Sequence, residues 1–373
     1  MALTIAEIRD LLASPPDPLR ERAFDVLAGI AATASEQPEG MSRELLIRAL
    51  DRREDFDGTA PMLDALVRHH GLYPYLADPD ELGTADRIAY EVHRPVGTDD
   101  LVFHAEQAQV YRLLADGHNV VLSAPTSFGK SLIIDGVIAT GRYRTVILVV
   151  PTIALIDETR RRLTQRFRDT YKIITHPSQV PADRTIYVLT QERVLDIPND
   201  RFPEVDFFAI DEFYKLDSSH DEDRAVLLNQ AFHRLHATGA QFYLLGPNID
   251  ALTADVRGRL EFQFICTDFQ TVALDTEIHR VAKHDLQPAV VRRCADLSGP
   301  TLLYVRSPKR AREVAGWLLE GGLGRPEDDL DGAAEWVART YHPDWLVARA
   351  LKNGIGIHHG RIPRALAHHV VRL

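Results

Sequence analysis

Between residues 101 and 285, short apolar runs alternate with stretches of helical periodicity, and this rhythm constrains the fold more than any other feature. Five runs are apolar along nearly their whole length: NVVLSA, RTVILVV, TIYVLT, VDFFAI and QFYLLG. Continuous apolar runs separated by helical segments are typical of parallel strands covered by helices on both faces of the sheet. The sequence therefore predicts an α/β fold built on a parallel sheet.

The segments on either side of this region have different patterns. Residues 1–100 contain short amphipathic stretches separated by segments rich in Pro, Gly and Asp: IAEIRDLLA, LRERAFDVLAGIAA, SRELLIRALDRR and PMLDALVRHHGLYPYLA. These predict helices. Farther on, TLLYVRS and SPKRAREVAGWLLE predict the start of another strand–helix unit. We expect a helical domain at 1–100, an α/β domain at 101–285 and part of a second α/β domain at 286–373.

Composition excludes several classes of protein. With 45% hydrophobic and 26% charged residues, the chain can bury substantial cores, so neither a disordered nor a fibrous protein is expected. No apolar run approaches the roughly 20 residues that a membrane-spanning helix needs, and the N-terminal segment lacks a secretory apolar core. Two cysteines, Cys266 and Cys294, are too few for a disulfide framework. The expectation is a cytoplasmic protein with no membrane partner.

The negative charge is unevenly distributed along the chain. The net charge is −11, and residues 1–100 hold 20 Asp and Glu against 10 Arg, so most of the acidity lies there. The remainder is nearly neutral. Because phosphate contact needs only a local basic track, an acidic chain does not exclude a nucleic-acid partner.

The sequence APTSFGKS at 124–131 lies between the run NVVLS and the helical stretch SLIIDGVIAT. A strand, a loop with Gly-Lys-Ser and a helix form the context of a phosphate-binding loop, in which backbone N–H groups face the phosphates. Lys130 would neutralise the phosphates and Ser131 would ligate Mg²⁺. Taken alone, this Gly-Lys-Ser is also compatible with a helix cap. The remaining loop residues expected to contact nucleotide are Thr126, Ser127, Phe128 and Gly129.

A second candidate element is VDFFAIDE, an apolar strand that ends in Asp211 and Glu212, 81 residues after Lys130. In nucleotide hydrolases such a strand delivers an Asp to the Mg²⁺ shell, and a neighbouring Glu takes a proton from the attacking water. Adjacent carboxylates after a strand are also common in surface turns. The strand context favours a catalytic pair.

In order and spacing these motifs resemble superfamily-2 helicases, within them the DExH group of archaeal repair helicases and exosome-associated RNA helicases. APTSFGKS resembles the first motif of that family, in which an initial Ala is usual. PTIAL at 151–155 is similar to motif Ia, TQER at 190–193 to the threonine motif that touches the nucleic-acid backbone, and GIGIHHG at 354–360 to a second-domain segment. The resemblance covers roughly residues 101–373.

The resemblance implies a P-loop RecA-like domain, an ATPase that binds ATP and Mg²⁺, and single-stranded DNA or RNA as partner. Gln107, 23 residues before Lys130, lies where the family has its adenine-reading glutamine. Thr152 and Thr190 are the expected backbone contacts. The segment 159–168 holds five arginines in ten residues; a solvated helix face is the usual explanation, but its position beside motif Ia favours one or two nucleic-acid contacts, and Arg160 is the candidate.

Three departures from the family pattern limit what it implies. Tyr214 replaces the usual His or Asp, and Gly246-Pro247-Asn248 replaces Ser-Ala-Thr. The chain also ends at Leu373, before the family's motif V and the arginine-finger motif VI. We therefore expect a truncated or split helicase completed by a downstream segment or a partner. The alternative is a nucleotide-gated binding module without turnover. Helicases with such unusual motifs occur in bacterial anti-phage systems.

Several histidines invite a metal site but do not support one. His358 and His359 are sequence neighbours, as are His368 and His369. Neighbouring residues point to different sides of a helix or strand, and carboxylates are missing nearby, so metal binding there is not expected. The pair at 220–221, His-Asp, lies in an acidic stretch and is expected to be a solvated turn.

Overall fold

The computed structural model describes residues 3–36, 39–76, 82–98, 100–217, 222–247, 249, 260–297, 299–326, 328–363, 366–367 and 370. Its contacts divide the chain into two units, Met1–Asp275 and Thr276–Leu373.

The first unit is built on a parallel sheet of seven strands in the order β3-β4-β2-β5-β6-β1-β7. The strands are β1 Val120–Ser123, β2 Thr145–Val149, β3 Lys172–Ile174, β4 Thr185–Leu189, β5 Phe207–Asp211, β6 Gln241–Gly246 and β7 Gln263–Cys266. All five predicted strands form, and the predicted fold class is confirmed. The three-residue β3 was missed because it lies at the sheet edge and is too short for a clear apolar run.

Alternating side chains of the strands enter two separate cores. Val120, Leu122 and Phe207 belong to one apolar cluster, whereas Val121 and Phe208 belong to the other. This alternation follows from the two-residue period of a strand. Because both faces are covered, the strands are apolar along their whole length, which is why they were recognisable in the sequence.

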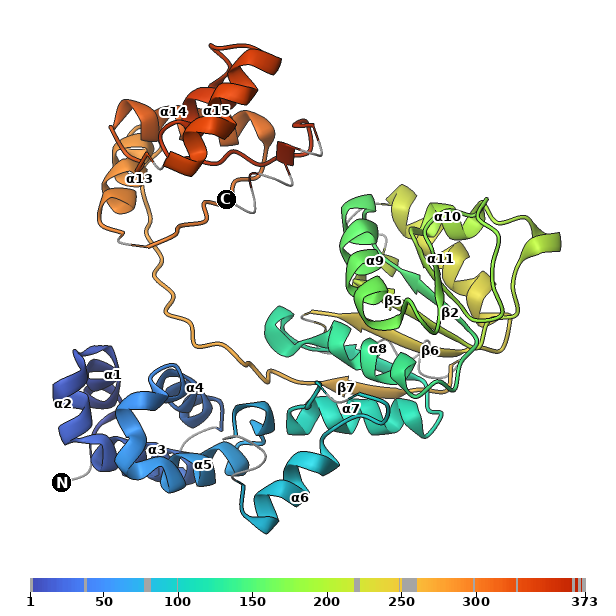
Figure 1. Cartoon of the computed structure of the whole chain (residues 1–373), viewed down its shortest axis with the longest axis horizontal. Coiled ribbons are helices and arrows are strands. Elements are labelled where there is room, and N and C mark those ends of the chain that lie inside the picture. Colours follow the sequence, from blue (N-terminus) through green and yellow to red (C-terminus); the bar gives the residue numbers. More distant parts are fainter. Residues whose placement is uncertain are drawn as a thin grey trace. The chain divides into compact units, whose positions relative to one another are not determined.

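Helices cover the two faces of the sheet (Figure 1). The first cluster contains residues of α7 Ala105–Ala115, α8 Lys130–Ala139 and α9 Ile153–Phe167, and the second contains residues of α10 Gln191–Leu195 and α11 Glu222–His236. Short 3-10 turns follow β1 at η3 Thr126–Phe128 and β5 at η5 Phe213–Leu216, and a third, η4 Asn199–Arg201, follows α10. Two of these turns, η3 and η5, shape the candidate site.

The N-terminal part of this unit is helical, as predicted. It contains α1 Ile5–Ala13, α2 Pro16–Glu21, α3 Ala23–Glu36, α4 Glu39–Leu50, η1 Arg53–Thr59, α5 Ala60–His69, η2 Tyr73–Tyr75 and α6 Thr84–Val92. The helix α1 begins and ends where the sequence predicted, and Thr4 caps it. The stretch LRERAFDVLAGIAA was predicted as one helix but falls across α2 and α3, with Arg22 between them.

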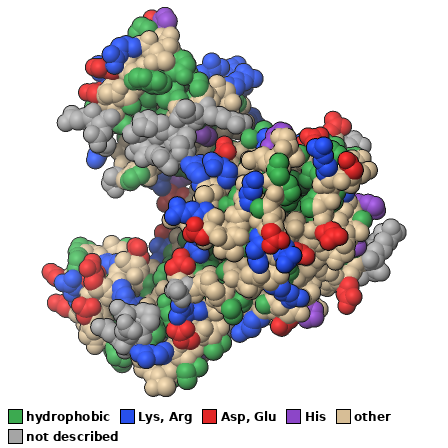
Figure 2. Space-filling model, turned by 45° about the vertical axis from the view of Figure 1, so that its right-hand side comes forward, with side chains coloured by type: hydrophobic (Ala, Val, Ile, Leu, Met, Phe, Trp, Pro, Cys, Tyr) green, Lys and Arg blue, Asp and Glu red, His purple; other side chains and the backbone are tan. Residues whose placement is uncertain are grey.

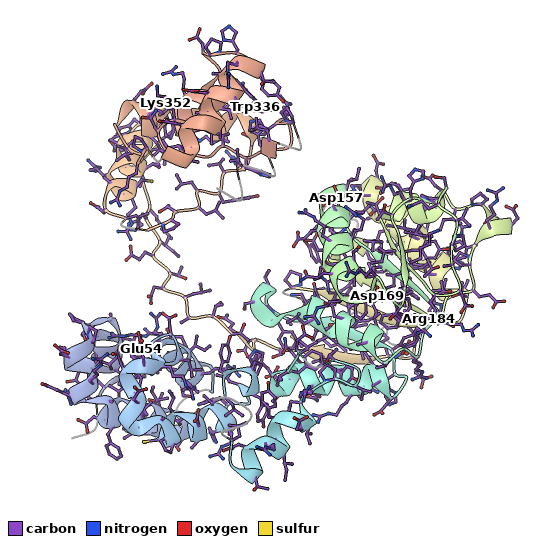
Figure 3. The ribbon with its side chains drawn as sticks, viewed as in Figure 1. Glu54, Asp157, Asp169, Arg184, Trp336 and Lys352 are labelled. Carbon is purple, nitrogen blue, oxygen red and sulfur yellow. The ribbon has the colours of Figure 1, made fainter. Side chains whose placement is uncertain are left out.

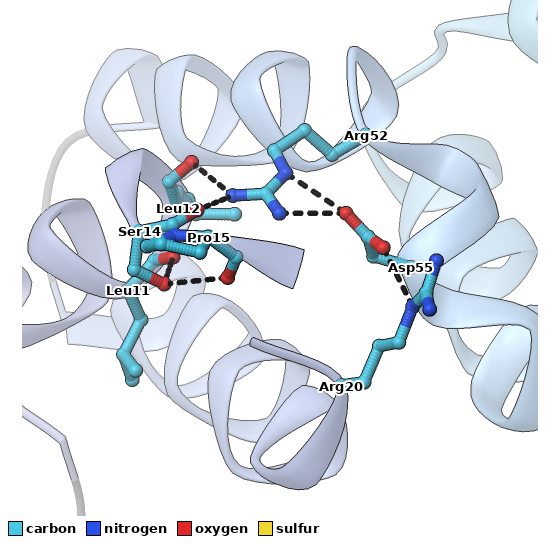
Figure 4. Close-up of polar contacts among 7 residues, drawn as sticks. All are labelled: Leu11, Leu12, Ser14, Pro15, Arg20, Arg52 and Asp55. Carbon is cyan, nitrogen blue, oxygen red and sulfur yellow. Dashed lines mark hydrogen bonds and ion pairs between the residues drawn. The ribbon is translucent and has the colours of Figure 1, made fainter. Parts of the chain in front are cut away.

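A buried carboxylate holds these helices together (Figure 4). The side chain of Asp55 is 5% exposed and accepts hydrogen bonds from Arg20 (2.8 Å) and Arg52 (2.7 Å). Arg52 also donates to the carbonyl oxygens of Leu12, at 3.0 Å, and Ser14. Although burial opposes ionisation, the two guanidinium groups together hold the pKa of Asp55 below its ordinary value. This carboxylate therefore ties η1 to α2 and to the end of α1.

The helical part and the sheet share one continuous apolar core. The first cluster runs from Ile8 and Leu27, through Phe56 and Leu72, to Phe103 and the inner residues of the sheet. Both parts belong to the same contact unit.

The second unit contains four helices in its described residues: α13 Leu286–Ala295, α14 Pro308–Glu320, α15 Asp328–Thr340 and α16 Leu346–Leu351. Its core includes Val337 and Ala350, both fully buried. Residues 301–305 were predicted as a strand, but in the structure they form neither helix nor strand. Leu302 and Tyr304 are 94% and 91% exposed. The strand prediction is wrong here because a strand needs a neighbouring strand, and the described residues of this unit provide none.

Candidate functional site

The loop between β1 and α8 combines a 3-10 turn with a left-handed glycine directly before a helix. It begins with the Ala124 N–H donating to Gly246 O (3.0 Å), passes through η3, and turns at Gly129 with φ +76° and ψ +34°. A Cβ at Gly129 would lie 2.6 Å from Gln107 Nε2. The left-handed backbone and this close approach both exclude a side chain, so only glycine fits. The N-terminus of α8 follows directly.

Lys130 points back into this loop. Its side chain is largely buried, and Nζ donates to the carbonyl oxygens of Ala124 and Pro125, each at 2.8 Å. Burial lowers the pKa of the Lys130 ammonium, and the negative charge of Asp211 opposes that effect. The loop thus concentrates a partly desolvated positive charge where phosphate oxygens are expected.

Asp211 and Glu212 lie at the carboxyl end of β5, where Asp211 is in register with Leu245 of β6. Burial raises the pKa of the Asp211 carboxyl, and the Glu212 carboxylate adds to the effect; a 2.9 Å hydrogen bond from the Glu212 N–H and the charges of Lys130 and Lys215 counteract it. Glu212 has φ +56°, and among the described residues it is the only non-glycine residue with a positive φ. Such a conformation costs of order 1 kcal/mol or more and tends to occur at functional sites.

The side chain of Glu212 is held by an ion pair with Lys215, three residues later in η5. Lys215 had no distinguishing signal in the sequence, and the structure places its ammonium against the candidate base. The pair neutralises the charge of Glu212 in this arrangement.

The residues expected to hold Mg²⁺ fit that ion chemically. Asp211 supplies a carboxylate and Ser131, exposed on the first turn of α8, supplies a hydroxyl, and Mg²⁺ prefers such hard oxygen ligands. Asp211 ends β5, and Ser131 follows the loop after β1. These two strands lie close together, because β6 pairs with β5 on one side and with β1 on the other. In the part of the chain that the structure describes, no group of three His, Cys, Asp or Glu residues could hold a metal. Mg²⁺ sites commonly use only one or two protein ligands together with phosphates.

Gln107 lies beside the loop, and its amide makes internal hydrogen bonds. Its Oε1 accepts from the His104 N–H (2.9 Å), and its Nε2 donates to Phe128 O (2.6 Å). Gln107 is buried. In the structure this residue joins the start of α7 to the phosphate-binding loop, a role that its position in the sequence did not suggest.

A cavity of about 350 Å³ adjoins Asp211 on the side of the predicted nucleic-acid track. Its lining residues come from the ends of β2 and β5 and from η5, α10 and α11: Val149, Val150, Pro151, Gln191, Asp211, Tyr214, Lys215, Arg224 and Leu228. Arg224 donates to Pro151 O (2.7 Å) and lies 3.8 Å from Glu192 Oε1. Sequence reasoning missed Arg224 because no motif surrounds it.

The predicted nucleic-acid contacts differ in their environments: Thr152 and Thr190 are sequence neighbours of the cavity-lining residues Pro151 and Gln191, and none of the three lines the cavity itself. Thr152 is exposed at the N-terminus of α9, where its Oγ1 accepts from the Leu155 N–H (3.3 Å). Thr190 precedes α10 and is buried. Arg160 is exposed on α9 and does not line the cavity. The structure therefore leaves Thr152 and Arg160 accessible and encloses Thr190.

The arginine-rich helix α9 uses its arginines in two ways. Figure 3 labels Asp157 on this helix and Asp169 just after its end. Arg162 pairs with Asp135 of α8, whose side chain is fully buried, and Arg166 lies 3.6 Å from the same carboxylate. Arg160 and Arg168 remain exposed. On the face shown in Figure 2, basic and acidic side chains are interspersed over the α/β part. The arginine run is thus partly structural.

The other sequence candidates are histidines and a turn. Among the described residues, His358 is exposed and His359 is half-buried, and neither belongs to a metal group. The positions His220, Asp221, Asn248, His368 and His369 lie outside the described residues. No helix in the described part of the chain combines the length and apolar character needed to cross a bilayer.

Comparison with known families agrees with this geometry. Residues 104–246, which contain the loop and the Asp-Glu pair, match the model of the DEAD/DEAH box helicase family. These residues are therefore similar to the helicase domains of that family. Residues 1–87 match the N-terminal domain of anti-bacteriophage protein B. A helical domain therefore precedes a RecA-like helicase domain, as the sequence predicted.

The chain is similar to anti-bacteriophage protein B of Escherichia coli strain K12, with 41% identity over 342 residues that cover 87% of this chain and 46% of that protein. It thus spans about half the length of this relative. Solved structures with some likeness include the DUF1998 helicase MrfA bound to DNA (14% identity, TM-score 0.46, 71% of this chain and 43% of that one). Another is a DEAD box protein from Methanococcus jannaschii (17% identity, TM-score 0.40, 79% and 76%).

Proposed function

We propose that the helicase domain binds ATP with Mg²⁺ and drives an ATP-dependent nucleic-acid helicase or translocase of superfamily 2. One observation carries the proposal. The loop after β1, into which Lys130 points, and the Asp211-Glu212 pair after β5 lie at the same end of the sheet, because β1 and β5 both pair with β6. Lys130 would hold the phosphates, and Ser131 and Asp211 would hold Mg²⁺, which supplies charge neutralisation during phosphoryl transfer. Glu212 would take the proton of the attacking water.

The test is nucleotide-dependent stabilisation. A ligand that binds only the folded state raises the melting temperature, and at a hundred times its Kd it adds about 2.7 kcal/mol. ATP with Mg²⁺ should therefore raise Tm by several degrees for the wild type and by little for Lys130→Ala. Lys172→Ala, which removes an exposed lysine of β3, is the matched control and should keep the full shift. Equal shifts for wild type and Lys130→Ala would refute the assignment.

We further propose that Thr152, Thr190 and Arg160 contact the backbone of single-stranded DNA or RNA. Phosphate contacts release counterions, so affinity should fall steeply with salt and depend little on sequence. Arg160→Gln should weaken binding and reduce the slope of log K against log salt by about 1. The control is Arg168→Gln, which removes another exposed arginine just after the same helix. If both variants leave the slope of log K against log salt unchanged, Arg160 does not contact the nucleic acid.

One observation supports the alternative, a nucleotide-gated module that binds without turnover: Lys215 neutralises the candidate base Glu212. Steady-state hydrolysis distinguishes the two functions. A nucleic-acid-stimulated rate that Glu212→Gln abolishes supports the helicase, whereas nucleotide binding with no such rate supports the module.

The similarity to anti-bacteriophage protein B leads us to propose a role in defence against bacteriophages. In cells that express the complete protein, wild type should lower the plating efficiency of a sensitive phage. If the role depends on ATP, Lys130→Ala should restore plating at unchanged protein level.

A further inference from the structure

A short segment after β7 runs between the helical part and the phosphate-binding loop. We call residues 267–275 the strap. It starts where Thr267 N donates to Ser123 O (3.0 Å) at the end of β1, and the Thr267 hydroxyl bonds Glu106 of α7. Phe269 is nearly fully buried, and its ring lies edge-on to that of Phe128 at 6.2 Å. The strap belongs to the same unit as both parts that it touches.

The strap makes a direct hydrogen bond to the loop. Thr271 Oγ1 donates to Ser127 O at 2.7 Å, and Gln107 Nε2 donates to the next carbonyl oxygen, that of Phe128. In a planar trans peptide the C=O and the following N–H point in opposite directions. Two anchored carbonyl groups therefore fix the orientation of the Gly129 N–H group and of the Phe128 N–H group, which donates to Pro125 O at 3.1 Å, and so the shape of the loop.

The other side of the strap is held by the helical part. The guanidinium of Arg43, a buried residue of α4, stacks on the ring of Phe269 at 4.1 Å from its centroid. At the end of the strap, Arg48 donates to both carboxylate oxygens of Asp275, at 3.0 and 2.7 Å. Between these anchors, residues 271–273 line a cavity of about 550 Å³ together with residues of the helical part. The strap is thus fixed at two arginines and is not tightly packed between them.

We propose that the helical part sets the geometry of the phosphate-binding loop through the strap, with Arg43, Phe269 and Thr271 as positioning residues for nucleotide binding. The inference rests on the proposed function of the loop. The inference gives the helical part a role in nucleotide affinity. The Arg43 guanidinium on the ring of Phe269 and the Thr271 hydroxyl together transmit the position of α4 to Ser127.

Thr271→Val tests the hydrogen bond at nearly constant volume. A single hydrogen bond contributes about 1 kcal/mol, so the Kd for Mg-ATP, measured by calorimetry, should rise about five-fold. Thr271→Ser keeps the hydroxyl and should restore the wild-type Kd. The control is Thr238→Val, which removes a 2.7 Å bond to Leu235 O and a 3.3 Å bond accepted from the Ala240 N–H, both away from the loop. It should lower Tm and leave the Kd unchanged.

Arg43→Met, which keeps the aliphatic stem but removes the stacked cation, tests the link to the helical part. It should raise the Kd about two- to five-fold, because an enclosed cation–π contact contributes of order 1 kcal/mol. If both residues act through one strap, Arg43→Met with Thr271→Val should raise the Kd by less than the product of the single effects.

The outcomes separate this inference from the proposed function. A wild type that does not bind Mg-ATP overturns both. A wild type that binds, with a Kd unchanged in Thr271→Val and in Arg43→Met, overturns the strap alone. Strictly multiplicative effects in the double variant would show that the two residues act independently, which also contradicts the inference.

Discussion

At the scale of single residues, burial decides the charge of several groups near the loop. His104 precedes α7 and contacts the strap residue Phe269, with 5.6 Å between ring centroids. It is buried, and that burial, with the charge of Arg43, lowers the pKa of its imidazole to about 4. His104 is therefore neutral in the folded protein at pH values where an exposed histidine is protonated.

This shift predicts a pH dependence of stability. Above the unfolded pKa of about 6.5 both states hold a neutral His104, so the group has no effect. As the pH falls from 6.5 towards 4, only the unfolded state gains the proton, and the free energy of unfolding should fall by up to about 3 kcal/mol. Urea melts at pH 7.0 and 4.5 measure the loss. The loss of unfolding free energy between the two pH values should be smaller in His104→Asn than in the wild type. It should equal the wild-type loss in His118→Asn, which replaces an exposed histidine. An equal loss in wild type and His104→Asn would contradict the assignment.

At the scale of elements, the helices after the loop and after β2 are joined by a buried ion pair. Asp135 lies in the middle of α8, and Arg162 of α9 bonds both its carboxylate and Ser131 O, the latter at 3.3 Å. Burial raises the pKa of the Asp135 carboxyl in spite of Arg162 and Arg166. The position of α9, whose N-cap is the exposed Thr152, is therefore tied to the helix that follows the loop.

We predict that Arg162→Met destabilises the protein by about 3 kcal/mol, because it leaves a fully buried carboxylate without its main partner. The double variant Asp135→Leu, Arg162→Met removes both charges and should recover most of this loss, since a buried pair can often be replaced by apolar residues. Chemical denaturation measures both. Arg160→Met, two residues earlier on an exposed face, should change stability by less than about 0.5 kcal/mol. A double variant no more stable than Arg162→Met would argue against a costly burial of Asp135.

At the scale of the whole molecule, tertiary contacts join the helical and α/β parts of the first unit. An apolar core that includes Leu72, Leu101 and Phe103 connects them, as does the Ala105 N–H donating to Gly71 O (2.9 Å). The contacts of the chain divide after Asp275. Residues 276–285 that follow it are all exposed.

Limited proteolysis should report this organisation. Trypsin should cleave first at Arg280 or Lys283, both exposed, because proteases act on exposed chain with few tertiary contacts. The expected product is a fragment of residues 1 to about 280 that keeps the helical and α/β parts together, and Arg280→Gln with Lys283→Gln should delay it. An earlier cut near residue 100, giving separate stable helical and α/β fragments, would contradict a shared core.

The sequence by itself determined the features that depend on local pattern. The strands could be predicted because burial on both sheet faces demands continuous apolar runs, and the loop because Gly129 and Lys130 must stand at fixed spacing between a strand and a helix. The tertiary structure decided what depends on distant partners. It showed that residues 301–305 form no strand, that Arg162 and Arg166 turn inward to Asp135, and that Gln107 bonds Phe128 O. Thr271 meets Ser127 across 144 residues of sequence. No periodicity encodes such a contact, because the sheet order and the path of the strap bring the two residues together.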